Sequence, residues 1–376
     1  MLLLARWASV TLILVVVAGC AVESEQDTTD DAPLGTPWTL ADPAPDEDGQ
    51  LKVLVLHDME GLSGQSDPRT FSYRNSEFYP QGQEYLIGDV NAVIRGLFDG
   101  GADVVQVVDG HGSGSPEPDI ILDRLDPRAE MYSRPEPFEA YVDLVGFTDF
   151  DAIAVVGMHA KTGSGGFASH TYTLGIGVRL NGQSITETEL VALSWGRVGV
   201  PVIFASGDDK LAADLATMPW IRYVTVKDAT SASTADVYPV DQVREQLRAE
   251  AKAAIEGLYS ARAMRPATPL AATLDAVPPS SLAALEGVPG IRYHDGSVTF
   301  TAESFADAYD GLTALIQVAV GGFSSVMGEV LVDLDPNARG EYSARLFDRW
   351  FDFESGRWTP LPPTAPPEGR TYYGYR

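Results

Sequence analysis

The apolar residues between positions 51 and 258 fall into short runs that predict strands alternating with helices. Three runs rich in β-branched residues each end at a glycine-containing loop, which is typical of strands buried on both faces of a parallel sheet. These runs lie at 51–57, 103–108 and 152–156, and further apolar runs at 200–205 and 223–226 extend the same sheet. Helical spacing of apolar residues predicts helices at 82–99, 187–197, 208–217 and 238–258.

A different pattern, alternation of apolar and polar residues, runs from Ser169 to Leu180 and is followed by Asn181-Gly182, a hairpin signal. Together the patterns predict an α/β fold. We expect a mostly parallel sheet flanked by helices, with a hairpin and a smaller C-terminal α/β portion, in one domain over 51–319. The stretch 320–376 is rich in Trp, Tyr, Phe and Pro and predicts an irregular C-terminal extension.

The first twenty residues have the pattern of a secretion signal. The apolar stretch 2–17 carries one positive charge, at Arg6, and is too short for a membrane-spanning helix. It ends in a Val-Ala-Gly-Cys motif that resembles the lipobox of bacterial lipoproteins, in which the cysteine is lipidated. Cys20 is the one cysteine of the chain, so no intrachain disulfide can form. We expect residues 1–20 to be a lipoprotein signal peptide with lipidation at Cys20; an ordinary secretory signal is the alternative.

The formal net charge of the chain is −27, and part of it is concentrated just after Cys20. Residues 21–50 contain nine Asp or Glu, no Lys or Arg, and several Pro. Such a segment buries too little apolar area to offset chain entropy, so we expect a disordered acidic tether. The expected location is the cell envelope, with the protein anchored to a membrane and facing the periplasm or the exterior. No basic stripe is visible, which argues against a nucleic-acid partner.

Polar side chains with metal-binding chemistry follow each of the three central strands. Asp58 and Glu60 follow the first strand and share a face, because alternate residues of an extended chain point the same way. His111 and His159 follow the second and third strands. Ligands of open α/β sheets bind at the carboxyl ends of the strands, and carboxylates with imidazoles bind zinc-like ions. Singly, a carboxylate can cap a turn and a histidine can be a core residue; their recurrence at one edge favours a metal site.

Two further residues are candidates for the same site. His170 follows the glycine-rich loop 163–166, which can bring backbone close to a ligand. At the start of the next predicted helix, Thr186 and Glu189 have the spacing of a capping box. This gives Glu189 a structural role and leaves Glu187, in the first helical turn, to face the sheet edge.

Five short segments occur in a fixed order along the predicted domain. They are His57-Asp58-Met59-Glu60-Gly61-Leu62-Ser63-Gly64, Val108-Asp109-Gly110-His111, Gly157-Met158-His159-Ala160, Ser169-His170-Thr171 and Ser206-Gly207-Asp208-Asp209. As an ordered set they resemble segments of the zinc-dependent D-aminopeptidases of the dipeptide-transport operon type, over residues 51–319. Each segment alone is a weak signal, whereas the set is specific.

The resemblance implies a dinuclear zinc site with two ions per subunit. The ligands that it implies are Asp58 as a bridge, Glu60 with His111 on one ion, and His159 with Glu187 on the other. His170 would be the essential histidine that does not bind metal and acts as general acid or base. The expected activity is removal of the N-terminal residue from short peptides, in particular D-amino-acid peptides such as D-Ala peptides, by a homo-oligomer.

Two other classes of function remain open from the sequence. A non-catalytic envelope lipoprotein with the same fold could bind peptides for a transporter, but its signature would be loss of metal ligands, and all five positions are kept. A structural envelope protein would need the C-terminal extension to be the active part. A chelator test on the purified protein separates the enzyme from the binding protein.

Overall fold

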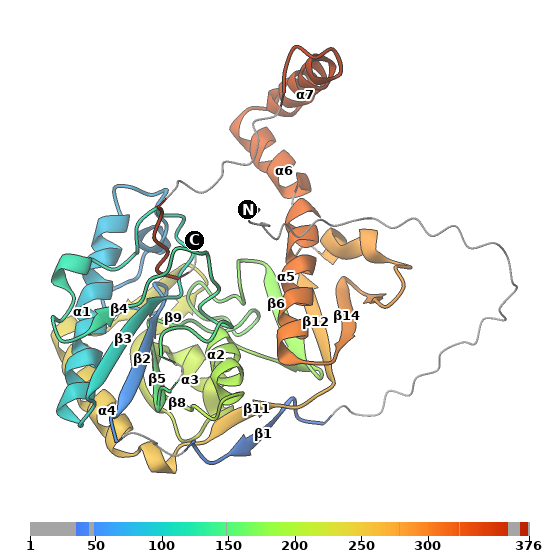
Figure 1. Cartoon of the computed structure of the whole chain (residues 1–376). Helices are drawn as coiled ribbons and strands as arrows, with labels where there is room; N and C mark the ends of the chain where they lie inside the picture. Colours follow the sequence, from blue (N-terminus) through green and yellow to red (C-terminus); the bar gives the residue numbers. More distant parts are fainter. Residues whose placement is uncertain are drawn as a thin grey trace, which may run out of the picture. The chain divides into compact units, whose positions relative to one another are not determined.

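The computed structural model describes residues 35–44, 49–147, 149–277, 279–322, 324–359 and 369–374. A seven-stranded sheet forms its centre (Figure 1). In spatial order the strands are β10 (Thr234–Val237), β9 (Arg222–Ser231), β8 (Val202–Asp208), β5 (Ala152–Val156), β2 (Lys52–His57), β3 (Val104–Asp109) and β4 (Glu130–Met131). All neighbouring strands are parallel except β9 and β10, so the prediction of a mostly parallel sheet is confirmed.

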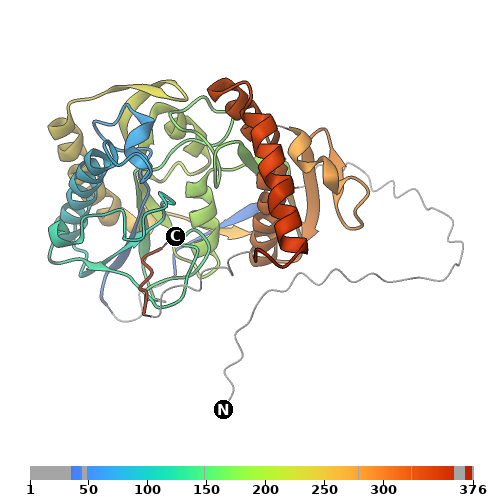
Figure 2. The ribbon, with the colours of Figure 1, turned by 90° about the horizontal axis from the view of Figure 1, so that it is seen from above.

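Helices cover both faces of this sheet, as Figures 1 and 2 show. They are α1 (Tyr79–Asp99), α2 (Glu187–Gly196), α3 (Asp209–Asp214) and α4 (Val240–Glu256). Val53 and Val55 of β2 lie in one buried apolar cluster with residues of α1 and α4. Leu54 and Leu56 point the other way, into a second cluster with residues of α2. Burial of both faces explains why the central strands are continuous apolar runs.

A second, five-stranded antiparallel sheet lies beside the first (Figure 1). Its strands are, in spatial order, β13 (Arg292–His294), β14 (Ser297–Ala302), β12 (Leu270–Ala276), β6 (Ile176–Leu180) and β7 (Gln183–Ser184). The predicted hairpin is β6–β7, and its turn residues Asn181 and Gly182 have φ of 48° and 81°. Strand β6 begins at Ile176, so the strand is shorter than the alternating pattern that starts at Ser169.

Several connections contain short 3-10 helices: η1 (Pro68–Phe71), η2 (Leu122–Arg124), η3 (Leu215–Thr217), η4 (Leu258–Ser260) and η5 (Pro279–Leu285).

Helix α5 (Phe305–Gly322) packs against the second sheet through one face, which includes Leu312 and Ala319. By length and apolar composition alone, the stretch Phe305–Leu334 could cross a membrane, with a mean hydropathy of 1.7. Core helices of folded domains meet the same test, and the buried face of α5 is of that kind.

The prediction of a disordered tether over 21–50 is wrong for part of that range. Residues Trp38–Ala41 form β1, which pairs antiparallel with β11 (Ala263–Pro266). The reason is local composition: these four residues are uncharged, and the Trp38 side chain is buried in the core. The acidic composition of the range 21–50 as a whole predicts disorder and gives no sign of this short strand. Cys20 and most of the acidic residues of the range 21–50 lie outside the described part of the chain.

The extension after residue 320 also differs from the irregular segment that its composition predicts. It contains α6 (Ser324–Leu334) and α7 (Ala338–Glu354). Several large apolar side chains of α7 remain exposed, among them Phe347, Trp350 and Phe351. Aromatic residues raised the expectation of irregular structure, although in α7 they occupy one side of an amphipathic helix.

Candidate metal centre

The turn after β2 carries the first two candidate ligands. The strand ends at His57, so Asp58 and Glu60 lie in a turn and not on an extended strand. The Asp58 N–H donates to the Val156 carbonyl at 2.8 Å, and the Gly61 N–H donates to Gly157 at 2.7 Å. A Cβ at Gly61 would lie 1.9 Å from the Met158 carbonyl oxygen, so only glycine fits this approach. These contacts hold the backbone of the turn against the end of β5.

His111 meets both of these carboxylates. Its Nδ1 lies 2.8 Å from Asp58 Oδ1 and 3.2 Å from Glu60 Oε2. Its Nε2 donates to the Phe71 carbonyl at 2.8 Å, which fixes the orientation of the ring. The three side chains are buried. They form the first half of the candidate site.

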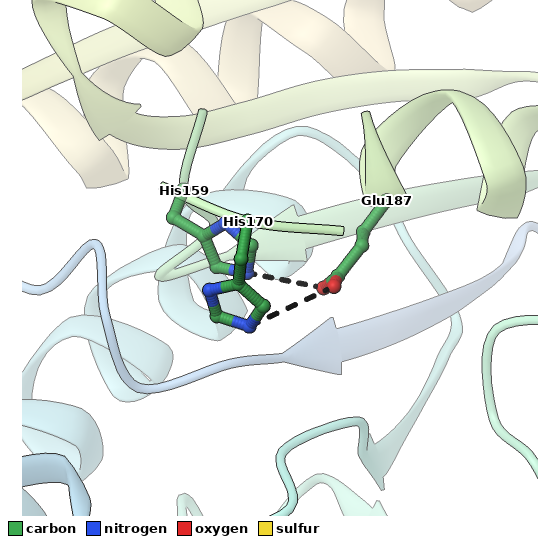
Figure 3. A group of neighbouring side chains, drawn as sticks. All are labelled: His159, His170 and Glu187. Carbon is green, nitrogen blue, oxygen red and sulfur yellow. Dashed lines mark ion pairs between the residues drawn. The ribbon is translucent and has the colours of Figure 1, made fainter. Parts of the chain in front are cut away.

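The second half of the site is built from His159 and Glu187, and it also uses Asp58. The Nε2 of His159 lies 3.2 Å from Glu187 Oε2 and 3.5 Å from Asp58 Oδ2 (Figure 3 shows the contact with Glu187). The Nδ1 of His159 donates to the Ala160 carbonyl at 3.0 Å. The two oxygens of the Asp58 carboxylate thus face histidines from two different strands.

Glu187 is placed by the start of α2. The Thr186 hydroxyl accepts from the Glu189 N–H at 3.0 Å, and the Glu189 carboxylate accepts from the Thr186 N–H at 2.7 Å. This is the capping box that the sequence predicts, and it occupies Glu189. Glu187 turns to the site, where its Oε1 accepts from the Tyr172 N–H at 2.5 Å.

His170 lies against the second half of the site (Figure 3). Its ring stacks on that of His159 with centroids 3.9 Å apart and an interplanar angle of 17°. Its Nδ1 donates to the Ala168 carbonyl at 2.6 Å, and its Nε2 lies 3.9 Å from Glu187 Oε1. The geometry alone allows His170 to be a third ligand with His159 and Glu187, or a proton donor and acceptor beside them.

The donor set fits a divalent cation. Each of the three histidines uses one ring nitrogen to donate to a backbone carbonyl and turns the other toward carboxylates, as metal-ligating histidines do. His159 Nε2 is buried and, although it lies 3.2 Å from Glu187 Oε2, it makes no hydrogen bond of good geometry to any described residue. No Lys or Arg in the described part of the chain forms an ion pair with the carboxylates of Asp58, Glu60 or Glu187. Oxygen and imidazole ligands in this number suit zinc.

The electrostatics of the site reflect crowded, buried acids and bases. Burial, and then the charge of Asp58, raise the pKa of Glu60 to about 7. Burial opposes ionisation of Asp58, but the hydrogen bond and charge of His111 outweigh it and hold the pKa of Asp58 below its usual value. Burial would lower the pKa of His159, yet the Glu187 carboxylate raises it to about 10. These histidines take the place of a cation between the carboxylates.

Two residues of the site, Tyr141 and Phe71, carry no signal in the sequence pattern, whereas a third, Lys227, directly follows the apolar run predicted as a strand at 223–226. The buried Tyr141 hydroxyl donates to Asp58 Oδ2 at 3.2 Å, and the Phe71 carbonyl holds His111. Lys227 is fully buried beside the turn that follows β2, where its Nζ donates to the Glu60 carbonyl at 2.6 Å. Burial lowers the pKa of Lys227 to about 7. Tyr141 and Phe71 lie outside regular strands, where periodicity gives no guide.

A cavity of about 390 Å³ opens over these side chains. Asp58, Glu60, His111, His170 and Glu187 face it. Apolar walls are supplied by Phe71, Leu174 and Val320, the last from α5. The site therefore combines a polar, acidic floor with apolar sides, which is the usual form of a small-molecule site.

The fold and the site together define an α/β protein with a buried carboxylate–imidazole centre. The chain matches the model of the D-aminopeptidase family, peptidase family M55, over residues 51–314, and it belongs to that family. This confirms the family predicted from the ordered segments, and with it the assignment of the protein as a peptidase. The individual roles of the site residues stay predictions.

Two relatives show how far the likeness extends. A D-aminopeptidase of Bacillus subtilis (strain 168) is 24% identical over 276 residues, which make up 72% of this chain and 98% of the relative. The solved structure of the Zn-dependent D-aminopeptidase DppA from Bacillus subtilis, described as a self-compartmentalizing protease, matches with a TM-score of 0.63 at 22% identity. The match covers 72% of this chain and 98% of the DppA chain, and the two proteins share the fold.

Proposed function

We propose that the protein is a zinc-dependent aminopeptidase that removes the N-terminal residue of short peptides, with preference for D-residues such as D-Ala. Family membership supplies the reaction class. The observation that carries the metal assignment is the placement of Asp58, whose Oδ1 faces His111 and whose Oδ2 faces His159. One carboxylate in this position can serve two cations. The Zn-dependence of the structural relative supports zinc as the metal.

Two zinc ions per chain would be held by the five buried ligands. Asp58 would bridge, with Glu60 and His111 on one ion and His159 and Glu187 on the other. Bound zinc supplies Lewis acidity, which polarises a scissile carbonyl and lowers the pKa of a water molecule from about 16 toward neutrality. The ligating carboxylates must be ionised and the imidazoles neutral, so zinc affinity should fall in acid.

His170 is the proposed general acid or base. Its side chain lines the cavity, and its Nδ1 is committed to the Ala168 carbonyl, which leaves Nε2 to accept or donate a proton. The stacked His159 ring and the Glu187 carboxylate hold it in this orientation. It can therefore transfer a proton to the amine that leaves when the peptide bond is cleaved.

The substrate would enter through the cavity. With the carboxylates committed to zinc, the uncharged N-terminal amine of a peptide would bind at one of the metals, and the walls at Phe71, Leu174 and Val320 can take the first side chain. The cavity of about 390 Å³ has room for a short peptide. These features favour small peptides over folded proteins as substrates.

The test compares hydrolysis of two dipeptides that differ only in the configuration of the first alanine. We expect the D-Ala peptide to be cleaved with the higher kcat/KM, and chelator treatment followed by zinc addition to abolish and then restore the rate. Glu187→Gln keeps the size of a ligand and removes its charge, so this variant serves as an inactive control. Chelator-resistant hydrolysis, or a higher kcat/KM for the L-Ala peptide, would contradict the proposal.

We also propose that the protein works as a homo-oligomer attached to the cell envelope. The self-compartmentalizing nature of the structural relative supports association of copies. Exposed Phe347, Trp350 and Phe351 on α7 add an apolar surface of the kind that marks interaction sites. The lipobox-like motif at Cys20 supports a lipid anchor. Size-exclusion chromatography and membrane fractionation test these two points separately.

A further inference from the structure

The last described residues return from the C-terminal extension to the edge of the central sheet that carries the metal centre. We name residues 369–374 the C-terminal strap; its end lies near the label C in Figure 1. The Tyr372 N–H donates to the Arg134 carbonyl at 2.8 Å, and the Arg134 N–H donates back to Tyr372 at 2.9 Å. The Asp109 N–H donates to the Tyr373 carbonyl at 2.9 Å. The strap thus joins the end of β3 to the segment that follows β4.

Two residues fix the strap in this position. The Tyr372 side chain is 6% exposed and packs in the large apolar cluster, with the Arg370 guanidinium 4.8 Å from the centre of its ring. Gly374 forms a parallel bridge with Asp109. A Cβ at Gly374 would lie 1.5 Å from the Asp109 carbonyl oxygen, so no other residue fits without displacing the strap.

Asp109 connects the strap to the metal centre. It is the last residue of β3 and stands two positions before the candidate ligand His111. Its Oδ1 accepts from the His111 N–H at 3.0 Å, and its Oδ2 accepts from the Asp119 N–H at 2.8 Å. The backbone of Asp109 is therefore held by the strap, while its carboxylate shapes the loop that presents His111.

We propose that the C-terminal strap is a positioning element that holds His111 in place for metal binding. The strap lies outside residues 51–314, which match the family, so this role belongs to the extension of this chain. The proposal rests on the zinc site proposed above. It predicts that loosening the strap weakens the half of the site built by Asp58, Glu60 and His111 and leaves the His159–Glu187 half intact.

The first experiment measures zinc affinity in the full chain by competition with a chelating dye. Gly374→Val and Tyr372→Ala should lower the affinity of one of two zinc sites by about 10–100-fold, the usual effect of losing a group that orients a ligand. Tyr372→Phe keeps the buried ring, and Thr371→Ala changes an exposed strap residue; both should retain wild-type affinity. Unchanged zinc affinity in both loosened variants would overturn the proposal.

A double-mutant cycle separates positioning from general destabilisation. If the strap acts through His111, adding Gly374→Val to His111→Ala should cause no further loss of zinc affinity at the remaining site. A further loss there would overturn the proposal.

Amide hydrogen exchange provides a readout that does not need zinc. In the metal-free full chain, the His111 and Asp119 amides should exchange faster in Tyr372→Ala than in Tyr372→Phe. Equal exchange would show that the strap does not hold the loop. If the loosened variant exchanges faster while the wild-type chain binds no zinc, the failure lies with the proposed zinc enzyme and the metal-positioning role falls with it.

Discussion

Asp58 is the side chain that both halves of the centre share. Its Oδ1 faces His111 and its Oδ2 faces His159, whereas Glu60 and Glu187 each meet one half. We expect Asp58→Ala to lose both zinc ions and His159→Ala to lose mainly one. Elemental analysis of the purified variants checks this. Two zinc ions per chain in the Asp58 variant would exclude a bridging role.

His170 has a different expected behaviour, because its proposed role is proton transfer. His170→Ala should keep the zinc content of the wild-type chain and lose a factor of about 10² to 10⁴ in kcat. Parallel measurements of metal content and single-turnover rate distinguish this role from ligation. If zinc is lost in proportion to activity, His170 is a ligand, as its contact with Glu187 also permits.

The candidate site residues could be predicted from the sequence because several of them occur at the same position, directly after a predicted strand. His111 and His159 each follow a recognisable apolar strand, and the capping box separates the role of Glu187 from that of Glu189. Alternation along a strand predicts that Asp58 and Glu60 point the same way, and both carboxylates do approach His111. The cause is different, because these residues lie in the turn after β2 and not on an extended strand. Tyr141 was missed because it lies in an irregular segment between β4 and β5.

At the level of secondary structure, the start of α2 decides where Glu187 points. Thr186→Ala removes the hydroxyl that accepts from the Glu189 N–H, so we expect the free energy of unfolding to fall by about 0.5–2 kcal/mol. Thr186→Ser keeps a hydroxyl at the same position and should lose much less. Urea unfolding of the metal-free variants measures both. Equal stability of the Ala and Ser variants would show that the cap contributes nothing.

The central strands and their helices could be predicted because burial on both faces leaves long apolar runs. The second sheet gave weaker signals: β12 is rich in alanine and contains Asp275, and β13 is only three residues long. Its existence was expected only as a hairpin and a smaller C-terminal portion. β1 was hidden in an acidic segment, since its pairing with β11 is a long-range contact that local composition does not encode.

Over the whole chain, the N-terminal motif predicts where the enzyme works. Cys20→Ser should move the protein to the soluble fraction or leave an uncleaved precursor, because the acidic segment after it has no apolar anchor of its own. The rate per bound zinc should stay unchanged, since Cys20 precedes the catalytic domain. Fractionation with and without detergent measures this. Complete release of the wild-type protein without detergent would contradict a lipid anchor.

The contacts of the C-terminal extension could not be predicted from the sequence. Its strap contacts Asp109 and Arg134, which lie far away in the sequence, and no local pattern in the strap marks these partners. Such contacts depend on the completed sheet edge. The sequence could predict that an extension exists, but its helices and its return to the metal centre required the folded chain.

The proposed dinuclear zinc site is tested most directly by zinc titration of chelator-stripped protein with D-Ala peptide hydrolysis as the readout. Because Asp58 faces two histidine-containing halves, we predict that the stripped chain is inactive and that the rate rises until two zinc ions are bound per chain. A rate that reaches its plateau at one zinc ion per chain, or hydrolysis that persists in the stripped protein, would contradict a dinuclear zinc aminopeptidase.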